Sequence, residues 1–576
     1  MSSLPRIILQ PCLKGYTKDL DKTVSPTDTL NHVRKRMEIC GKNVLSSTRR
    51  VDIGRLGIPV YLSICGDDAR AVMPTRKQMG KGSSPEQAQA SAVMELMERF
   101  AFFSFWEAKP HMVSASWCEA QHLFANNLLP IADMLKSVED SLDNDTAARV
   151  LDLCRWKFFP ATHLLREEIV WLPLDWFKLL NEFNGTSAGN SNEESLLQGV
   201  CELVERHVCC QIDRHHLAMP TITPESCDAP VLQNLLTAFA REGIHLILKD
   251  FSLNMPLPTV GALAWDEKTF PDSSEIVFTA GTATSPAKAA IRAVTEVAQL
   301  AGDFCTNACY EASGLGKFRE LAETEWLTSG PSIALKTLPS VASADIRDEL
   351  HTALRALAPF EAYAIATTHP EMQIPAHYTI IPGLSFRERD KNQSLGLFVG
   401  RKLVEENDMQ TALAGLSTLE SCFPNAHFLP FFRGMLAMRA DDHETAQQCF
   451  RTARDVQPDS ESQALAAFYD GYIDTLQGRW REAIPALATA QTLCRDMKEY
   501  SNLLGVAHFK IGQYEEAARA FRDVLRIDKG SAMDLANLGV CEKKLGLQTK
   551  AKEHLEAALE LDASLEFART HLAELE

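Results

Sequence analysis

The chain has 576 residues, of which 45% are hydrophobic and 23% are charged. This length predicts more than one domain, and the composition is typical of a globular protein with a large core. The formal net charge of -18 argues against a nucleic-acid-binding protein held by a broadly basic surface, although it leaves a local basic groove open.

The sequence offers no sign of export or of membrane insertion. The start, MSSLPRIILQ, lacks the charged segment and the apolar run of roughly 7–15 residues that mark a signal peptide. No run of about 18 apolar residues predicts a transmembrane helix.

The fifteen cysteines form no C-x-x-C, and the closest patterns are Cys305-x-x-x-Cys309 and Cys209-Cys210. We therefore expect reduced thiols, a cytoplasmic protein and no membrane partner.

Residues 1–385 alternate short apolar runs with helical patterns. The runs include VYLSIC at 60–65, HLILKDF at 245–251, EIVFTAG at 275–281 and YTIIPG at 378–383. Apolar runs of this length are typical of buried strands, so an α+β region is expected.

A first polar stripe is predicted in GKGSSPEQAQASAVMELMERFAFFSFW. Ser84 followed by Pro85 predicts a helix start with the serine as N-cap. Ser91, Glu95 and Glu98 follow the spacing i, i+4, i+7 and therefore share one face of this helix. Apolar residues fill the other faces, which predicts a buried helix whose carboxylates point inward.

The motif E-L-x-E-R of this helix returns 107 positions later, in GTSAGNSNEESLLQGVCELVERHVCC. On this second predicted helix, Glu194, Gln198, Glu202 and Glu205 share one face. A third helix is predicted in GTATSPAKAAIRAVTEVAQLAG, where positions 292, 296 and 299 carry the polar stripe RxxxExxQ. Each of the three helices follows a loop rich in Gly, Ser or Thr.

Buried carboxylates are unfavourable unless they are paired or bind a metal ion. One interpretation is ion pairing with Arg99 and Arg206, each four residues after a glutamate. The glutamates outnumber these arginines, however, and Mg²⁺ prefers oxygen ligands, while helix N-termini bind anions. The second interpretation is a metal–nucleotide site.

The common nucleotide-binding motifs are missing. There is no G-x-x-x-x-G-K-[ST], and the fragment GKG at 80–82 is followed by Pro85 where G-x-G-x-x-G needs a third glycine. Any nucleotide site is therefore expected to be of another kind.

The C-terminal third is built from repeats, because one glycine recurs at steps of 34, 37, 34 and 34 residues. An alanine follows each glycine after twelve residues, and Leu or Phe follows after sixteen. The three columns are Gly400, Gly434, Gly471, Gly505 and Gly539; Ala412, Ala446, Ala483, Ala517 and Ala551; and Leu416, Phe450, Leu487, Phe521 and Leu555. Small residues allow two helices to approach closely and the large column fills the space between them.

These columns resemble the tetratricopeptide repeat (TPR) family over roughly residues 394–565. The Tyr that this family places three residues after the glycine is replaced by Ala437, Asp474, His508 and Glu542 in the last four copies. HLAELE at the end predicts part of a capping helix. The resemblance implies either a groove that binds a peptide or a partner protein, or a packing module that supports a homodimer.

The ordered motifs of the first two thirds resemble the YcaO family. They are S-x-x-x-E-x-x-E-R on the first helix, S-A-G-N-x-x-x-E and E-x-x-E-R around the second, and R-x-x-x-E on the third. DKTVSPTDTL and TIIPGL agree as well, so the match spans roughly residues 15–390. It implies an α+β YcaO-type ATP-binding domain over 1–390, followed by an all-α TPR solenoid over 394–576.

The resemblance implies ATP and Mg²⁺ as cofactors, in a fold without a Walker loop. Family members activate a backbone amide, whose oxygen takes the γ-phosphoryl group, and phosphate loss gives an azoline, a thioamide or an amidine. By position in the motifs, the ATP contacts would be Lys22, Thr29, Ser91, Glu95, Asn190, Glu194, Arg206 and Arg292, and the Mg²⁺ ligands would be Glu98, Glu202, Glu205 and Glu296.

The chain ends in ARTHLAELE and lacks the Pro-rich tail of azoline-forming members. The resemblance therefore favours a stand-alone member that acts on a peptide or protein by cyclodehydration or thioamidation. One alternative is a nucleotide-binding accessory or scaffold protein that assists another enzyme, for example in methylthiolation of a ribosomal protein. Another is a pure TPR adaptor with an inactive N-terminal domain.

Overall fold

The computed structural model describes residues 6–52, 54–109, 111–301, 304, 318–387, 393–528 and 530–575. It contains two compact units: unit 1 comprises residues 1–144 and 155–393, and unit 2 comprises residues 145–154 and 394–576. The cysteines in the described ranges are free thiols, whereas Cys305 and Cys309 lie outside these ranges. Within the described residues, no helix combines the length and the apolarity needed to cross a bilayer.

Unit 1 contains three β-sheets. The first has the order β1-β2-β3, and all its pairs are antiparallel: β1 (Leu45–Arg50), β2 (Val60–Cys65) and β3 (Lys77–Lys81). The second has the order β11-β10-β9-β8-β12: β8 (Thr221–Ile222), β9 (His245–Asp250), β10 (Thr259–Trp265), β11 (Val277–Thr282) and β12 (Ser332–Ile333). The third has the order β4-β5-β13-β14-β7 with β6 beside β5: β4 (Val113–Ala115), β5 (Trp156–His163), β6 (Glu168–Pro173), β7 (Thr186–Ala188), β13 (Tyr363–Ala366) and β14 (Ala376–Ile380).

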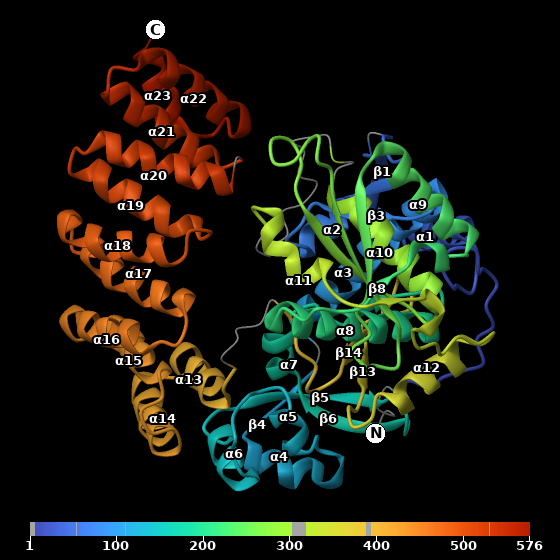
Figure 1. Ribbon diagram of the computed structural model, residues 1–576. Helices are drawn as coiled ribbons and strands as arrows, with labels where there is room; N and C mark the ends of the chain where they lie inside the picture. Colours follow the sequence, from blue (N-terminus) through green and yellow to red (C-terminus); the bar gives the residue numbers. More distant parts are fainter. Residues whose placement is uncertain are drawn as a thin grey trace. The chain divides into compact units, whose positions relative to one another are not determined.

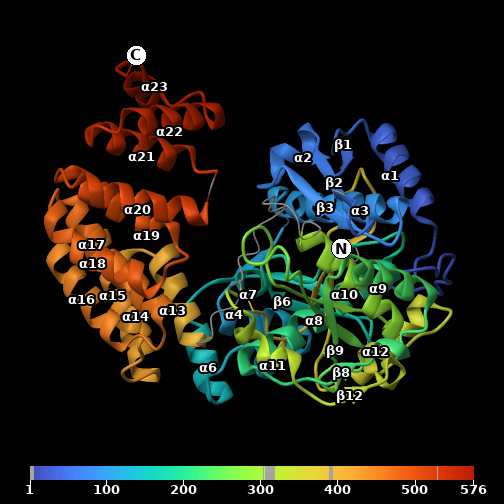
Figure 2. The ribbon, with the colours of Figure 1, turned by 45° about the horizontal axis from the view of Figure 1, so that its top comes forward.

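Three long helices lie against these sheets. Helix α3 (Pro85–Glu107) packs on β2 and β3, α10 (Pro286–Ala301) packs on β10 and β11, and α8 (Asn192–His215) packs on β7 and β14. Figures 1 and 2 show the three helices in the middle of unit 1. The other α-helices of unit 1 are α1 (Pro26–Cys40), α2 (Asp67–Val72), α4 (Trp117–Phe124), α5 (Ile131–Leu135), α7 (Leu174–Asn181), α9 (Pro230–Glu242), α11 (Glu325–Thr328) and α12 (Ile346–Ala356).

Side-chain caps fix where two of the long helices begin. The Ser84 side chain accepts a hydrogen bond from the Gln87 backbone N–H, and the Ser191 side chain accepts one from the Glu194 backbone N–H. Each cap satisfies a backbone donor that a helix start leaves without an intrahelical partner. The predicted start of the first helix at Ser84 is therefore confirmed.

Unit 2 is helical: α6 (Asn144–Leu151), α13 (Leu395–Glu406), α14 (Met409–Cys422), α15 (Phe428–Arg439), α16 (His443–Val456), α17 (Ser460–Leu476), α18 (Trp480–Leu493), α19 (Lys498–Lys510), α20 (Tyr514–Ile527), α21 (Ala532–Lys544), α22 (Gln548–Leu561) and α23 (Glu566–Ala573). From α15 onward, each helix packs against the next one in the chain. The expected α+β region followed by an all-α repeat array is therefore confirmed.

The glycine column is a place of close packing in the array. In the last four copies, a Cβ atom built on the glycine would lie within 3.0 Å of the side chain sixteen residues later: Gly434 with Phe450 at 2.9 Å, Gly471 with Leu487 at 2.8 Å, Gly505 with Phe521 at 2.9 Å, and Gly539 with Leu555 at 2.8 Å. The first copy differs, because the nearest side chain to such an atom on Gly400 is Phe432, at 2.5 Å. The glycine column thus packs against the Leu/Phe column in four copies, which agrees with the expected close approach of the helices.

In the last four copies, the turn inside the helix pair uses left-handed backbone seven residues after the column glycine. The residues there are Asp441, Gly478, Gly512 and Gly546, with φ values of 56°, 71°, 80° and 78°. A left-handed residue at this place ends the first helix and lets the chain reverse. Glycine adopts this conformation without steric penalty, which explains three of the four residues.

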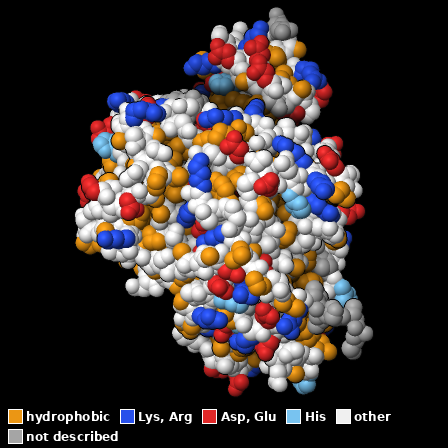
Figure 3. Space-filling view, turned by 90° about the vertical axis from the view of Figure 1, so that its right-hand side faces the viewer, with side chains coloured by type: hydrophobic (Ala, Val, Ile, Leu, Met, Phe, Trp, Pro, Cys, Tyr) orange, Lys and Arg blue, Asp and Glu red, His pale blue; other side chains and the backbone are white. Residues whose placement is uncertain are grey.

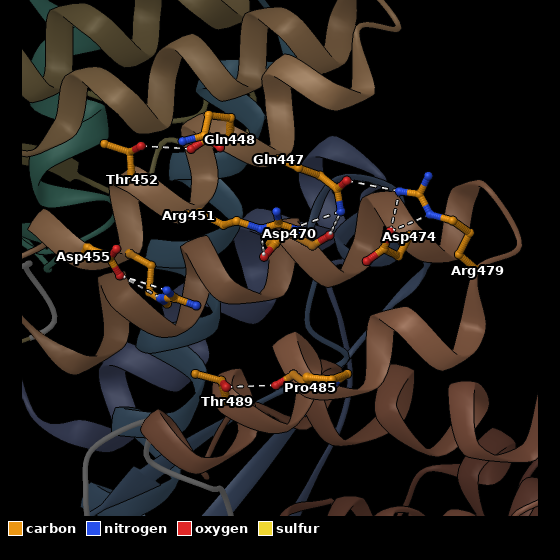
Figure 4. A network of polar contacts seen from close by, with 11 residues as sticks. Gln447, Gln448, Arg451, Thr452, Asp455, Asp470, Asp474, Arg479, Pro485 and Thr489 are labelled. Atoms are coloured by element: carbon orange, nitrogen blue, oxygen red, sulfur yellow. Dashed lines mark hydrogen bonds and ion pairs between the residues drawn. The ribbon is translucent and has the colours of Figure 1, made fainter.

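Two residues that replace the expected tyrosine column are buried acids with basic partners. Arg479 Nε donates to Asp474 Oδ1 at 2.8 Å, and Arg479 Nη2 donates to Gln447 Oε1 at 3.1 Å (Figure 4). In the last copy, Arg522 Nη2 donates to Glu542 Oε1 at 3.0 Å. Ion pairs between neighbouring helices therefore stand where an aromatic ring was expected.

Candidate functional site

The polar side chains predicted on α3, α8 and α10 are half-buried, except Glu194, which is buried, and the apolar side chains between them are mostly buried. The half-buried residues are Ser91, Glu95, Glu98 and Arg99 on α3, Gln198, Glu202, Glu205 and Arg206 on α8, and Arg292, Glu296 and Gln299 on α10. Half-buried side chains can be held by the protein and still meet a ligand that arrives from solvent.

Glu98 and Arg99 connect α3 to the third sheet. The hydroxyl of Thr186 donates to Glu98 Oε1 at 2.8 Å, and Arg99 Nη1 donates to the Thr186 hydroxyl at 3.0 Å. Arg99 also pairs with Glu98 at 3.3 Å, and its guanidinium lies 4.4 Å from the centre of the Phe183 ring. The arginine of the first E-L-x-E-R motif is therefore held by an ion pair, a hydrogen bond and an aromatic ring at once.

The second E-L-x-E-R motif behaves differently. Arg206 Nη2 lies 3.8 Å from Glu202 Oε1, which is the i,i+4 pair that the sequence predicts. Glu205 instead reaches across to the second sheet, where its Oε2 accepts the backbone N–H of Thr282 at 2.7 Å. This bond joins α8 to the end of β11.

Lys81, the last residue of β3, is a site residue that the sequence motifs did not assign. Its ammonium group forms an ion pair with Glu296 of α10. Burial, together with the nearby Arg292, lowers the pKa of Lys81 to about 8, against the opposite effect of Glu205 and Glu95. The only trace of this residue in the sequence is the GKG fragment, which does not complete a glycine-rich nucleotide-binding loop.

A second polar cluster forms where residues 10–23 cross the N-terminus of α8. Lys22 Nζ lies 3.3 Å from Glu194 Oε1, and this carboxylate also accepts the Thr23 backbone N–H at 3.0 Å and Asn190 Nδ2 at 3.0 Å. Burial alone would raise the pKa of Glu194, but Lys22 and these hydrogen bonds outweigh burial and lower the pKa. Three of the predicted ATP contacts are thus brought together here.

The same N-terminal segment has further anchors. The Gln10 backbone N–H donates to Glu193 Oε1 at 2.7 Å, and the Cys12 backbone N–H donates to Asp345 Oδ1 at 3.0 Å. Thr29, another predicted ATP contact, is buried on α1, and its hydroxyl donates to a carbonyl of the preceding turn at 3.1 Å. The structure therefore places Thr29 within α1, bonded to its own helix.

The three stripes, together with Lys81, bring acidic and basic side chains close to one another. The cluster consists of five glutamates and four cations: Glu95, Glu98, Glu202, Glu205, Glu296, Lys81, Arg99, Arg206 and Arg292. Burial raises the pKa of Glu98 to about 8, although Arg99 opposes the rise, and the neighbouring Glu202 and Glu95 add to it. By contrast, the molecular face drawn in Figure 3 shows Lys and Arg side chains interspersed with Asp and Glu.

These residues fit a magnesium ion together with phosphate. Carboxylate oxygens are the ligands that Mg²⁺ prefers, and burial raises the pKa of Glu98, so a bound cation would stabilise the charged form of this carboxylate. Arg292 Nη1 donates to Gln198 Oε1 at 3.2 Å, while its buried Nε has no hydrogen-bond partner among the described residues. Among the described residues, no group of three Asp, Glu, His or Cys side chains is placed to hold a metal ion. Glu205 instead accepts the Thr282 backbone N–H, and Glu296 pairs with Lys81.

A family model described as YcaO cyclodehydratase, ATP- and Mg²⁺-binding, matches residues 79–385, and two tetratricopeptide repeat models match residues 477–532 and 535–565. An uncharacterized protein of Methanothermobacter thermautotrophicus is 23% identical over 424 residues, which cover 66% of this chain and 98% of that protein. The ribosomal protein S12 methylthiotransferase accessory factor YcaO of Escherichia coli is 26% identical over 202 residues, which cover 31% of this chain and 34% of that protein.

Among solved structures, a heterocyclase in complex with substrate and cofactor superimposes with a TM-score of 0.52 at 18% identity. The match covers 66% of this chain and 55% of the heterocyclase chain. This likeness identifies the fold of the matched region.

Proposed function

Because the chain belongs to the YcaO family, whose members bind ATP and Mg²⁺, we propose that it uses both to activate a backbone amide in a peptide or protein substrate. The observation that carries the proposal is the cluster of five glutamates and four cations that α3, α8, α10 and the end of β3 bring together. Phosphoryl transfer depends on positioning and on neutralising charge, and such a cluster serves both.

Each assigned residue has a role in this proposal. Glu98, Glu202, Glu205 and Glu296 would hold Mg²⁺, which when bound would neutralise charge on the phosphoryl group. The two arginines Arg206 and Arg292 pair with phosphate oxygens. The remainder of the nucleotide is held by Lys22, Thr29, Ser91, Glu95, Asn190 and Glu194.

The proposed chemistry is the one that the resemblance to the YcaO family implies. A nucleophile adds to the carbonyl carbon of the amide, and the amide oxygen takes the γ-phosphoryl group while the bond to ADP breaks. Phosphate then leaves with the former amide oxygen, so the nucleophile replaces oxygen on that carbon. An internal nucleophile gives a ring by net loss of water, and a sulfur nucleophile gives a thioamide.

Peptide mass spectrometry tests this function even when the substrate has not been identified. Proteins from host cells that produce the wild type are compared with proteins from cells that produce Glu205→Gln. Loss of one water from a peptide, or exchange of one amide oxygen for sulfur, is expected only with the wild type. A wild type that binds MgATP but causes neither change would count against amide activation.

The name of one relative favours a second function. The Escherichia coli relative is named as a methylthiotransferase accessory factor, although this chain spans only 34% of its length. In this alternative, the present chain binds nucleotide and assists a separate modification enzyme. The mass-spectrometric comparison distinguishes the two functions, because an assisting protein changes peptides only when its partner enzyme is also present.

We also propose a division of labour, with nucleotide chemistry in residues 1–390 and partner binding in residues 394–576. A cavity of about 240 Å³ lies among α19, α20, α21 and α23, lined by Val506, Phe509, Lys510, Phe521, Asn537, Val540, Phe567 and His571. Apolar walls with one lysine and one histidine suit a peptide that carries an apolar side chain beside a carboxylate. The free thiols of the described residues support a cytoplasmic location as part of the same proposal.

Val540→Arg tests this cavity, because it places a charged side chain on the apolar wall. We expect the variant to lose a partner protein that co-purifies with the wild type. Lys544→Ala, on the same helix but outside the lining, serves as the control. Light scattering of the purified chain shows whether the partner is instead a second copy. If Val540→Arg and Lys544→Ala recover equal amounts of the partner protein, this cavity is not its binding site.

A further inference from the structure

Lys81 belongs to none of the nucleotide or metal contacts assigned above. It ends β3, and its ammonium group pairs with the Glu296 carboxylate, which α10 brings from the second sheet. Glu95 of α3 and Glu205 of α8 lie near enough to influence it. A single lysine of the first sheet therefore pairs with α10 and lies in the electrostatic field of acidic side chains on α3 and α8.

This ion pair competes with a metal ion. Glu296 offers its oxygens to both cations, and an ammonium group and Mg²⁺ repel each other at one carboxylate. Lysine carries its charge on a flexible four-carbon stem, so the ammonium group can move away while β3 stays in place. The side chains of Lys81 and Glu296 are 22% and 27% exposed, so a ligand from solvent can reach both.

The numbers of acidic and basic side chains in the cluster also favour replacement of Lys81 by Mg²⁺ at Glu296. The cluster holds five glutamates against four cations, and without the Lys81 charge it would hold five against three. Mg²⁺ supplies more positive charge to the carboxylates than the lysine does. A lysine displaced by Mg²⁺ is then free to form a charge-assisted hydrogen bond to phosphate.

We propose that Lys81 is an internal counter-cation that Mg²⁺ displaces from Glu296, and that its ammonium group then pairs with a phosphate oxygen of the bound nucleotide. The inference rests on the proposed function and adds to it a residue and an order of events. Mg²⁺ alone meets a competitor at Glu296, and ATP alone meets a lysine that is already engaged. Each ligand therefore improves the binding of the other, which is positive coupling.

Binding of Mn²⁺, a paramagnetic substitute for Mg²⁺, to the full-length chain without nucleotide tests the displacement. Lys81→Met removes the competitor, so electron paramagnetic resonance should show Mn²⁺ binding about tenfold more tightly than to the wild type. The same variant should bind MgATP about tenfold more weakly, because the phosphate loses its lysine. Lys81→Arg, which keeps the charge, and Lys77→Met, at the exposed start of β3, should both retain the wild-type affinity for Mn²⁺.

The outcomes separate this inference from the proposed function. If the wild type binds MgATP and Lys81→Met binds Mn²⁺ no more tightly than the wild type, the counter-cation role is overturned while the proposed function stands. If the wild type does not bind MgATP, both are overturned. If circular dichroism shows that Lys81→Met does not fold, Lys81→Gln replaces it, because glutamine removes the charge and keeps a donor for Glu296; the same tightening is expected.

Discussion

Glu205→Gln separates the structural role of Glu205 from its proposed metal role. The Glu205 side chain accepts the Thr282 backbone N–H at 2.7 Å. Glutamine keeps an acceptor oxygen, so this bond changes from a charge-assisted to a neutral one, a loss of about 1 kcal/mol. Relief of repulsion with Glu202, whose pKa Glu205 helps to raise, acts in the opposite direction. We therefore expect the free energy of unfolding to change by no more than about 1 kcal/mol.

The expected effect on ligand binding is larger. Loss of one charged oxygen contact costs roughly 1.5–3 kcal/mol, which corresponds to a loss of about 10- to 150-fold in affinity. Calorimetric titration of ATP, with and without Mg²⁺, measures this difference directly. The part of the affinity that depends on Mg²⁺ should fall, while the Tm shifts by only about 2–4 °C or less.

Glu193→Gln is the matched control for this experiment. Glu193 lies twelve residues before Glu205 on α8, about 18 Å along the helix axis. It accepts the Gln10 backbone N–H at 2.7 Å, so the substitution makes the same chemical change to a bond of the same length. A folded Glu205→Gln protein that binds MgATP as tightly as the wild type would refute the assignment of Glu205. Equal losses in both variants would show a structural effect.

Further predictions concern stability. Burial lowers the pKa of His377 to about 4, below the value of about 6.5 in an unfolded chain. The unfolded state thus takes up the proton first, and the free energy of unfolding falls by up to about 1.4 kcal/mol per unit as the pH drops from about 6.5 to 4. Denaturant titrations at several pH values give the slope of the free energy of unfolding against pH. This slope should be smaller for His377→Asn than for the wild type, and equal slopes would contradict this account. Gly512 has a φ of 80° with open space around an added Cβ, so Gly512→Ala should cost about 1–2 kcal/mol through the backbone alone; an unchanged midpoint of thermal unfolding would refute this. Gly505→Ala should destabilise the wild type by up to about 2 kcal/mol but stabilise the Phe521→Ala protein, where the added methyl group has room; additive effects in a double-mutant cycle would rule out the contact.

Helical periodicity predicted which side chains share a helix face, whereas their roles toward ATP and Mg²⁺ stay a prediction. A buried helix presents side chains at fixed spacing, so the stripes of α3, α8 and α10 could be found and now lie on half-buried faces. Lys81 is not part of any helical spacing pattern, so the sequence did not single it out. It ends a strand, where alternation predicts only the face of the sheet, and its partner Glu296 follows 215 residues later.

The repeat columns predicted packing in detail because the same contact recurs in each copy. The grouping of residues 145–154 with unit 2 could not be predicted in this way. Ala147, Val150 and Leu151 of α6 form an apolar stripe, which indicates that one side is covered. Such a stripe does not identify the covering element, because periodicity is a local property of the chain.

The anchored N-terminal segment has a consequence for biosynthesis. The ribosome makes residues 10–23 before their partners, because Glu194, which binds Thr23, follows 171 residues later, and Asp345, which binds Cys12, follows 333 residues later. At about 5–20 residues per second, the second of these anchors is missing for roughly 17 s or more. Contacts over such separations form late in folding. A nascent chain in which synthesis has not reached Asp345 therefore leaves residues 10–23 without their final anchor, accessible to chaperones and proteases.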